Sequence, residues 1–261
     1  MQNTGLEVKK YPSNTLLAGV VGSRAYGMNT QDSDTDTLGV FAANSKDVLG
    51  LRSEKVINES KVYTSPDAVF HEIGKFCRLA LAANPTILEL LYLDKYQVQN
   101  EQGKKLVLLR EEFLSSQKVF NSYGGYARSQ AARLVSRSRS GKEGFGTVPV
   151  NRIAKHGRHC MRLLLQGEQL LLTGNLNLHV GQQRERLFAA GELAVKDIDS
   201  YNQVVDKEFK KLENALENTV LSPVANVETV NEFLVNTREL QLSRLLKVEN
   251  KKEFYNKGRG L

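Results

Sequence analysis

The chain lacks tryptophan and has only two cysteines among its 261 residues. Cys77 and Cys160 do not form a CxxC pair, which excludes a zinc site built on cysteine. Each lies beside apolar residues in a helical pattern, and this favours two buried free thiols in a reducing cytoplasm over a disulfide. No apolar run approaches the length of a membrane span, and residues 1–10 have no signal-peptide core. We therefore expect a cytoplasmic protein without a membrane partner.

Acidic residues are scarce in one long segment, residues 121–165. This segment holds nine Lys or Arg and a single acid, Glu143, so its net charge is +8. The whole chain has 36 basic and 29 acidic residues, which leaves 27 basic and 28 acidic ones elsewhere, a net charge of −1. A positive charge this concentrated indicates a polyanionic partner, either a nucleoside triphosphate or a nucleic-acid backbone.

The hydrophobic pattern predicts an α+β fold in two parts that meet near residue 98. With 41% hydrophobic and 25% charged residues, the chain has a globular composition and can bury a substantial core. Residues 1–98 alternate between strand and helix patterns, whereas residues 99–261 are almost entirely helical in pattern. The first part is expected to contain a strand that runs into a helix over 67–83, then a helix over 86–93. Later helices are expected over 101–114, 116–137, 151–173, 182–192, 197–218 and 226–246.

The densest functional signal lies between residues 19 and 41, which read GVVGSRAYGMNTQDSDTDTLGVF. A short apolar strand ends in Gly22-Ser23, and Asp34 and Asp36 lead into a second apolar run. Side chains at i and i+2 of a strand share a face, so the two carboxylates repel unless a cation neutralises them. Mg²⁺ prefers such oxygen ligands where a substrate brings phosphates. Gly22 allows a ligand to approach closely, and a helix starting at Ser23 would offer free N–H groups to a phosphate.

Two other interpretations of this stretch are weaker. A calcium loop starting at Asp32 would need glycine at its sixth position and glutamate at its twelfth, where the chain has Thr37 and Ala43. A polar hairpin turn explains Asp32 and Ser33. It does not explain the two carboxylates that lead into the following strand.

The spacing of Gly-Ser and Asp-x-Asp resembles the signature of the DNA-polymerase-β-like nucleotidyltransferase superfamily. The form GSRAYG…DSDTDTLGVF is most similar to the RNA-repair-pathway DNA-polymerase-β family, a family of predicted nucleotidyltransferases. The similarity spans roughly residues 16–240 and includes Asn84-Pro85…Glu89-Leu90-Leu91 and Lys155-His156…His159…Arg162. It implies a small mixed-sheet nucleotidyltransferase domain over residues 1–98, followed by a mostly helical domain over residues 99–261.

The resemblance also implies a third metal-binding carboxylate on a later strand. We choose Asp67, because it follows the break at Pro66 and precedes an apolar step. Glu72 is the alternative, although the first turn of a helix favours an acid for its own reasons. A helix N-cap is the competing explanation for Asp67. The predicted catalytic and metal-binding residues are therefore Asp34, Asp36 and Asp67.

Phosphate binding is predicted at Gly22, Ser23 and Arg24. Ser23 and the backbone after Gly22 would hold the β- and γ-phosphates. Arg24 would add a charge-assisted contact, with a solvated surface arginine as the alternative.

The expected helix over 151–173 carries a basic stripe. Lys155, His159, Arg162 and Gln166 recur at helical spacing, and the stripe has no acid before Glu168. A solvated helix face normally mixes both signs of charge. We therefore predict that Lys155, His159 and Arg162 line the nucleotide or acceptor cleft, with a solvated face as the alternative.

Two further features of the basic segment suit a nucleic acid. Residues 136–142, SRSRSGK, are predicted to form a loop that embraces an RNA backbone or closes over the triphosphate, with a linker as the alternative. Tyr123 and Tyr126 are candidates for stacking on a base, although aromatic residues at this spacing more often pack in a core.

These features together predict a Mg²⁺-dependent nucleotidyltransferase, with Mn²⁺ as a substitute ion. It would move a nucleoside monophosphate from a nucleoside triphosphate to a hydroxyl by two-metal phosphoryl transfer and release pyrophosphate. The family resemblance and the basic segment favour an RNA end, such as that of a tRNA, as the acceptor. A protein hydroxyl is the main alternative acceptor. A catalytically silent nucleotide or RNA sensor is a further alternative, which the intact Gly-Ser and Asp-x-Asp disfavour.

Overall fold

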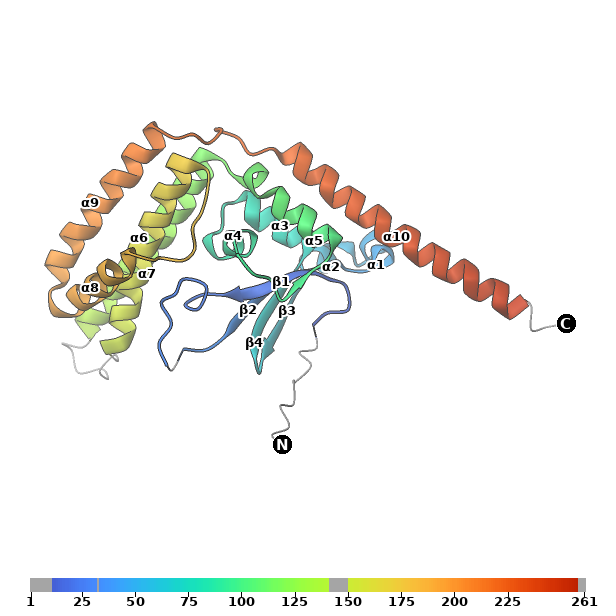
Figure 1. Cartoon of the computed structure of the whole chain (residues 1–261), viewed down its shortest axis with the longest axis horizontal. Coiled ribbons are helices and arrows are strands. Elements are labelled where there is room, and N and C mark those ends of the chain that lie inside the picture. Colours follow the sequence, from blue (N-terminus) through green and yellow to red (C-terminus); the bar gives the residue numbers. More distant parts are fainter. Residues whose placement is uncertain (1–10, 32, 141–149, 258–261) are drawn as a thin grey trace.

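A five-stranded sheet forms the centre of the N-terminal part in the computed structural model, which describes residues 11–31, 33–140 and 150–257 (Figure 1). The strands are β1 (Thr15–Val21), β2 (Asp36–Phe41), β3 (Ser60–Thr64), β4 (Asp67–Glu72) and β5 (Val98–Gln99). They lie in the order β3-β4-β2-β1-β5. β2 and β4 are parallel, and the other neighbouring pairs are antiparallel. The predicted mixed sheet is confirmed.

The helices of the N-terminal part are α1 (Ser45–Leu49), α2 (Ser53–Ile57), α3 (Ile73–Leu81) and α4 (Pro85–Leu91). Of these, α3 and α4 pack against β1 and β2, whereas Val48 of α1 and Val56 of α2 pack on a separate cluster that contains Phe41 and Phe70. Alternate residues of β2, Leu38 and Val40, join a core with Phe76 of α3 and Leu88 of α4, as the period of two along a strand requires. The helix expected after Pro85 is confirmed, with the Asn84 side chain as its N-cap.

The C-terminal part is helical, as predicted. Its elements are α5 (Glu101–Leu108), the 3₁₀ helix η1 (Arg110–Phe113), α6 (Ser116–Ser140), α7 (Val150–Thr173), α8 (Gln183–Lys196), α9 (Ile198–Glu217) and α10 (Val227–Lys257). Helices α6 to α9 form a bundle beside the sheet, whereas α10 crosses back over the N-terminal part (Figure 1). There Arg238 pairs with Glu72, and Gln241 Nε2 donates to the carbonyl of Ala42 at 3.2 Å.

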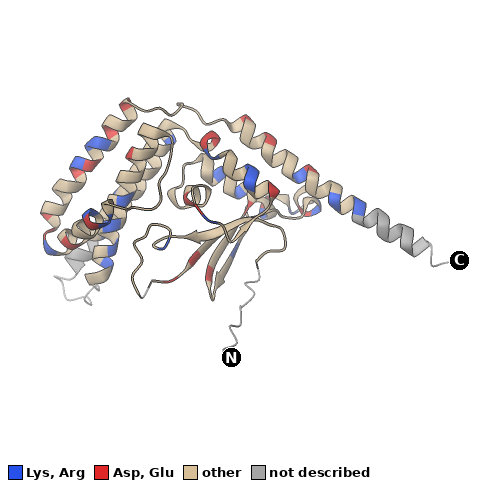
Figure 2. Cartoon of the chain, viewed as in Figure 1, with Lys and Arg blue, Asp and Glu red and all other residues tan. Residues whose placement is uncertain are grey.

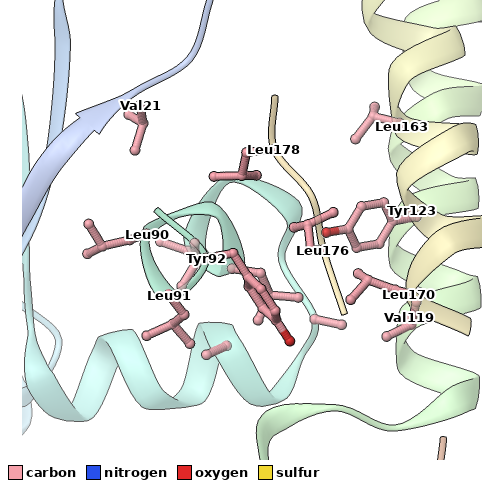
Figure 3. Packing of buried hydrophobic residues seen from close by; sticks show 14 of the residues in the cluster. Val21, Leu90, Leu91, Tyr92, Val119, Tyr123, Leu163, Leu170, Leu176 and Leu178 are labelled. Atoms are coloured by element: carbon pink, nitrogen blue, oxygen red, sulfur yellow. The ribbon is translucent and has the colours of Figure 1, made fainter. Parts of the chain in front are cut away.

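The bundle and the sheet part share a continuous hydrophobic core (Figure 3). Apolar residues at the end of α4 face apolar residues of α6 and α7, and the segment that follows α7 runs between them. The residues are Leu90, Leu91, Tyr92, Val119, Tyr123, Leu163, Leu170, Leu176 and Leu178. The boundary between the domains 1–98 and 99–261 stays a prediction.

Several helical predictions needed correction, and the helix expected over 226–246 is longer, because α10 extends to Lys257. The helix expected over 101–114 is two helices, because α5 ends at Leu108 and η1 follows. The loop expected over 136–142 is also wrong for residues 136–140, which continue α6. Arginine favours helix, and this stretch has neither glycine nor proline before Gly141. Gly141 and Lys142 lie outside the described residues.

Both cysteines are buried free thiols, as predicted. Burial raises the pKa of Cys77 to about 12 and the pKa of Cys160 to about 11. Tyr123 is fully buried, so the base-stacking prediction is wrong for it, whereas Tyr126 is 41% exposed. Among the described helices, none has the length and apolar character needed to cross a membrane.

Candidate active site

Two of the predicted aspartates lie together at one edge of the sheet. Asp36 is the first residue of β2, and Asp67 is the first residue of β4. Because these strands are parallel neighbours, with Thr37 beside Ala68, Asp36 lies level with Asp67. Neighbouring strands are about 4.8 Å apart and level side chains point to the same face, so both carboxylates can reach one cation. Asp34 precedes Asp36 in the loop that leads into β2.

The three aspartates have the surroundings of an open cation site. All three side chains are exposed, and among the described lysines and arginines none forms an ion pair with them. Within the described ranges, no group of three or more His, Cys, Asp or Glu is arranged to hold a metal ion, so the structure does not bring Asp34, Asp36 and Asp67 together as a three-carboxylate site. Mg²⁺ commonly uses one or two carboxylates and completes its coordination with water and substrate phosphates. The pair therefore fits an ion shared with a triphosphate.

A glycine turn borders the aspartates. β1 ends at Val21, which pairs with Asp36, and Gly22 follows with a φ of +72°. A Cβ at this position would lie 3.0 Å from Asp36 Oδ2. L-residues disfavour this φ, and a side chain would press on the carboxylate. Glycine at position 22 therefore allows both the positive φ of the turn and the close approach of the Asp36 carboxylate.

The residues after Gly22 form a compact turn rather than the helix predicted to start at Ser23. The Tyr26 N–H donates to the Gly22 carbonyl at 3.1 Å, and the Met28 N–H donates to the Ser23 carbonyl at 2.9 Å. Gly27 has a second positive φ, +68°, which a continuing helix would not contain. We call residues 22–28 the glycine turn.

Arg24 links the glycine turn to the aspartate loop. Its Nη2 donates to the Ser33 carbonyl at 2.8 Å, and its Nε donates to the Asp34 carbonyl at 3.3 Å. The side chain is exposed, and a guanidinium has five N–H donors, so donors remain for a ligand. The predicted phosphate contact of Arg24 stays a prediction.

Glu72 is placed elsewhere, so the alternative third ligand is wrong. It lies at the opposite end of β4 from Asp67, about 16 Å along the strand at the usual rise per residue. It is fully buried, caps α3 by accepting the Gly74 N–H at 2.7 Å, and pairs with Arg238 of α10. It therefore stabilises the junction of α10 with the sheet part and cannot share an ion with Asp36.

Part of the basic stripe on α7 faces the interior. Arg162 and Gln166 are 3% and 5% exposed. Arg162 Nη1 donates to Gln166 Oε1 at 2.5 Å and to Glu89 Oε1 at 3.2 Å. The Arg162 guanidinium carbon lies 3.8 Å from the centre of the Tyr26 ring. This burial contradicts the prediction that Arg162 lines an open cleft.

Lys155 and His159 lie nearer the N-terminus of the same helix. Lys155 is exposed, and His159 is half-buried. Because arginine only donates, His159 Nδ1 accepts the hydrogen bond of 3.1 Å from Arg162 Nη2. Burial, and then the nearby cationic side chains, lower the pKa of His159 to about 3, so this imidazole is neutral near pH 7. The place of Lys155 and His159 in a nucleotide or acceptor cleft stays a prediction.

Two residues are absent from the predicted site: Tyr26, which lies in the glycine turn, and Glu89, which contacts it. The Tyr26 hydroxyl donates to Glu89 Oε1 on α4. Burial raises the pKa of the Glu89 carboxyl, whereas the Arg162 guanidinium, the Tyr26 hydroxyl and the Gly22 N–H lower it. The available signal was a single acid inside the apolar run ILELL, which suggests a buried and therefore paired carboxylate.

The segment after α7 also contacts the glycine turn. The Val180 N–H donates to the Tyr26 carbonyl at 3.0 Å, and Arg184 Nε donates to the Gly27 carbonyl at 3.2 Å. The turn is thus supported from the helical part as well as from the sheet. Figure 2 shows acidic positions on the strands and basic positions on the neighbouring helices α6 and α7.

A mixed sheet with aspartates at one edge beside a Gly-Ser turn is the arrangement expected of a polymerase-β-like nucleotidyltransferase. The sequence matches the RNA repair pathway DNA polymerase beta family over residues 6–236, and the chain belongs to this family.

Similar proteins include one from Bacillus subtilis and one from Exiguobacterium sibiricum. The uncharacterized protein YcgL of Bacillus subtilis (strain 168) is 24% identical over 239 residues, which cover 88% of this chain and 92% of that protein. A nucleotidyltransferase-like protein from Exiguobacterium sibiricum 255-15, with a crystal structure at 1.90 Å resolution, is 14% identical. That comparison covers 92% of this chain and 87% of the other, with a TM-score of 0.30.

Proposed function

We propose that the protein is a Mg²⁺-dependent nucleotidyltransferase that moves a nucleoside monophosphate from a nucleoside triphosphate to a hydroxyl and releases pyrophosphate. The observation that carries this proposal is the level placement of Asp36 and Asp67 next to Gly22. Membership of the polymerase-β family supports it.

In this proposal, the aspartates hold the metal ion and the glycine turn holds the phosphates. Asp36 and Asp67 would hold Mg²⁺, with Asp34 as the third carboxylate. When bound, the ion would neutralise the triphosphate and lower the pKa of the attacking hydroxyl. Ser23 and the backbone of the glycine turn would orient the β- and γ-phosphates. Arg24 keeps the aspartate loop near that turn through the Ser33 and Asp34 carbonyls.

The proposed transfer forms one bond to the α-phosphorus and breaks another. The acceptor oxygen forms a bond to the α-phosphorus, and the bond from that phosphorus to the pyrophosphate oxygen breaks. The hydroxyl proton leaves to a carboxylate or to water.

An RNA end, including that of a tRNA, is the acceptor that we favour. The support is the net charge of +8 over residues 121–165 together with the exposed Arg152 and Lys155 at the start of α7. These side chains lie one turn apart and so share a face of the helix. A charge array of this kind binds a phosphate backbone without reading its sequence.

A labelling experiment tests the proposal. The protein is incubated with each of the four nucleoside triphosphates, labelled at the α-phosphate, together with total RNA or total protein and with Mg²⁺ or a chelator. We expect Mg²⁺-dependent label in the RNA pool. Label in the protein pool instead would establish a protein hydroxyl as the acceptor. Label in neither pool, with tight triphosphate binding retained, would support a catalytically silent sensor and overturn the proposal.

A further inference from the structure

A buried charged cluster connects helix α7 to the glycine turn. Its members are Tyr26 in the turn, Glu89 on α4, and Arg162 and Gln166 on α7. Tyr26, Glu89, Arg162 and Gln166 are all between 2% and 8% exposed. Arg162 donates hydrogen bonds to Glu89 and Gln166, and its guanidinium stacks on the Tyr26 ring. The Tyr26 hydroxyl donates to the same Glu89 oxygen.

The position of this cluster is unusual for a purely structural ion pair. A buried pair is rarely more stabilising than apolar residues of the same volume, so its retention points to a geometric requirement. Here three separate elements of the chain meet at one carboxylate oxygen. One of the three, the glycine turn, is the segment that borders Asp36.

The cluster fixes the turn at Tyr26. The Tyr26 side chain is held by Glu89 and Arg162, its N–H donates to the Gly22 carbonyl, and its own carbonyl accepts the Val180 N–H. Moving Tyr26 would therefore move the carbonyl of Gly22 and the backbone beside Asp36. Apolar residues of α4, including Leu90 and Leu91, face apolar residues of α6 and α7 in the shared core (Figure 3).

We propose that Glu89 and Arg162 are positioning residues for the nucleotide-binding turn: through Tyr26 they hold residues 22–28 in the conformation that accepts the triphosphate. This inference rests on the proposed function of the turn. Neither residue touches the reacting atoms. The helical part thus contributes to the site by ordering the turn, in addition to any contact that its basic residues make with the acceptor.

The junction of α10 with the sheet offers a matched control. Arg238 and Glu72 also form a pair between a C-terminal helix and the sheet part, with side chains 16% and 0% exposed. That pair lies at the opposite end of β4 from Asp67 and does not contact the turn. Arg162→Met and Arg238→Met remove the same charge and keep a side chain of similar length.

Hydrogen exchange tests the proposal without relying on activity. The reporters are the amides of Tyr26, Gly27 and Met28, which all donate within the turn. We expect Arg162→Met to speed their exchange at least 10-fold, Arg162→Lys to restore part of the protection, and Arg238→Met to leave these amides unchanged. Tyr26→Phe removes only the hydroxyl, and we expect it to speed exchange in the same amides if Arg162→Met fails to fold.

Separate values of KM and kcat provide the second measurement. If the turn is binding-competent only part of the time, the apparent dissociation constant rises by the inverse of that fraction. We expect Arg162→Met to raise KM for the triphosphate about 10-fold, with kcat changed less than about 3-fold. Arg238→Met is expected to keep the KM of the wild type.

The outcomes separate this proposal from the proposed function. Unchanged exchange at Tyr26, Gly27 and Met28 in both Arg162→Met and Tyr26→Phe would overturn the positioning role. So would equal effects of Arg162→Met and Arg238→Met on the turn. If the wild type transfers no nucleotide, the proposed function fails. In that case, the role of Glu89 and Arg162 in ordering the turn is still decided by two measurements. They are hydrogen exchange and triphosphate binding, each compared between the wild type and Arg162→Met.

Discussion

Asp36 and Asp67 begin neighbouring parallel strands and lie level with each other at the edge of the sheet. Parallel pairing is the reason: it brings the starts of β2 and β4 to the same edge, and it places the ends of both strands at the other. Glu72 lies at that other end and is buried beside Arg238. The two acids proposed for the third position therefore have different roles that mutation can separate.

Replacing Asp67 should affect activity, whereas replacing Glu72 should affect stability. We expect Asp67→Asn to lower nucleotidyl transfer at least about 100-fold, because it removes a carboxylate that we propose to bind the metal ion. Its free energy of unfolding should stay within about 0.5 kcal/mol, since the side chain is exposed. Glu72→Gln should lower the free energy of unfolding by about 1–3 kcal/mol, because the charge of Arg238 loses its partner. Denaturant unfolding and transfer assays measure both.

The exposed residue Asp206 on α9 provides the control for this comparison. Asp206→Asn should leave transfer and stability unchanged. Full transfer by Asp67→Asn, in a preparation where Asp36→Asn is inactive, would remove Asp67 from the site.

A side chain at Gly22 should lower transfer because it would contact the Asp36 carboxylate, in addition to straining the backbone. Gly22→Ala and Gly181→Ala both place alanine at a positive φ, +72° and +48°, which costs about 1–2 kcal/mol. Only at Gly22 does the added Cβ meet a carboxylate, Asp36 Oδ2 at 3.0 Å, whereas nothing lies within 4 Å of it at Gly181. We expect similar losses of stability but at least about 10-fold lower transfer for Gly22→Ala alone. Equal transfer by the two variants would show that Gly22 is needed only for the turn.

His159 should make stability depend on pH. Its pKa is lowered to about 3 in the folded protein by burial and by nearby cations, whereas an unfolded histidine has a pKa near 6.5. The unfolded state therefore binds more protons between these values, so stability falls as the pH drops below about 6.5. From pH 7 to pH 5 we expect His159 to account for a loss of about 2 kcal/mol. Urea unfolding of the wild type and His159→Gln at both values measures it.

The comparison of the two proteins removes the contribution of the carboxylates, which both share. A pH dependence of unfolding in His159→Gln as steep as that of the wild type would show that the imidazole is not buried in its neutral form.

The basic face of α7 should contribute to RNA binding through salt-dependent contacts. Arg152 and Lys155 are exposed and lie one turn apart. Each phosphate contact on a single strand contributes about 0.7 to the slope of log K against log salt, so Arg152→Gln with Lys155→Gln should reduce the slope by about 1.4. The double variant Lys207→Gln with Lys210→Gln removes the same charge from the exposed face of α9 and should leave the slope unchanged. Equal slopes for both double variants would move the RNA site elsewhere.

The sequence predicted the parts of this molecule that depend on local pattern. Period-two and helical repeats placed the strands around Gly22 and Asp36, and Asn84-Pro85 marked the start of α4. The helix predicted over 151–173 ends at Thr173, and Gly174 after it has a φ of +67° and donates its N–H to the Leu170 carbonyl at 2.9 Å. Such signals act between residues close in the chain, so a single sequence contains them.

The parts that the sequence did not predict depend on contacts between distant residues. The burial of Arg162 follows from Glu89, 73 residues earlier, and from Tyr26 on a third element. Periodicity placed Arg162 on a stripe with Lys155 but could not show that the stripe passes from the surface into the interior. Likewise, only strand pairing distinguishes Asp67 from Glu72, because the two acids lie at opposite ends of β4 and only Asp67 lies level with Asp36.

The position of the transferred label tests the central claim most directly. The wild type and Asp36→Asn are incubated with Mg²⁺, RNA and a triphosphate labelled at either the α- or the γ-phosphate. We predict that the wild type attaches the α-label to RNA and releases the γ-label as pyrophosphate, and that Asp36→Asn or a chelator prevents both. Transfer of the γ-label to the acceptor, or full α-label transfer by Asp36→Asn, would contradict a nucleotidyltransferase with Asp36 at its centre.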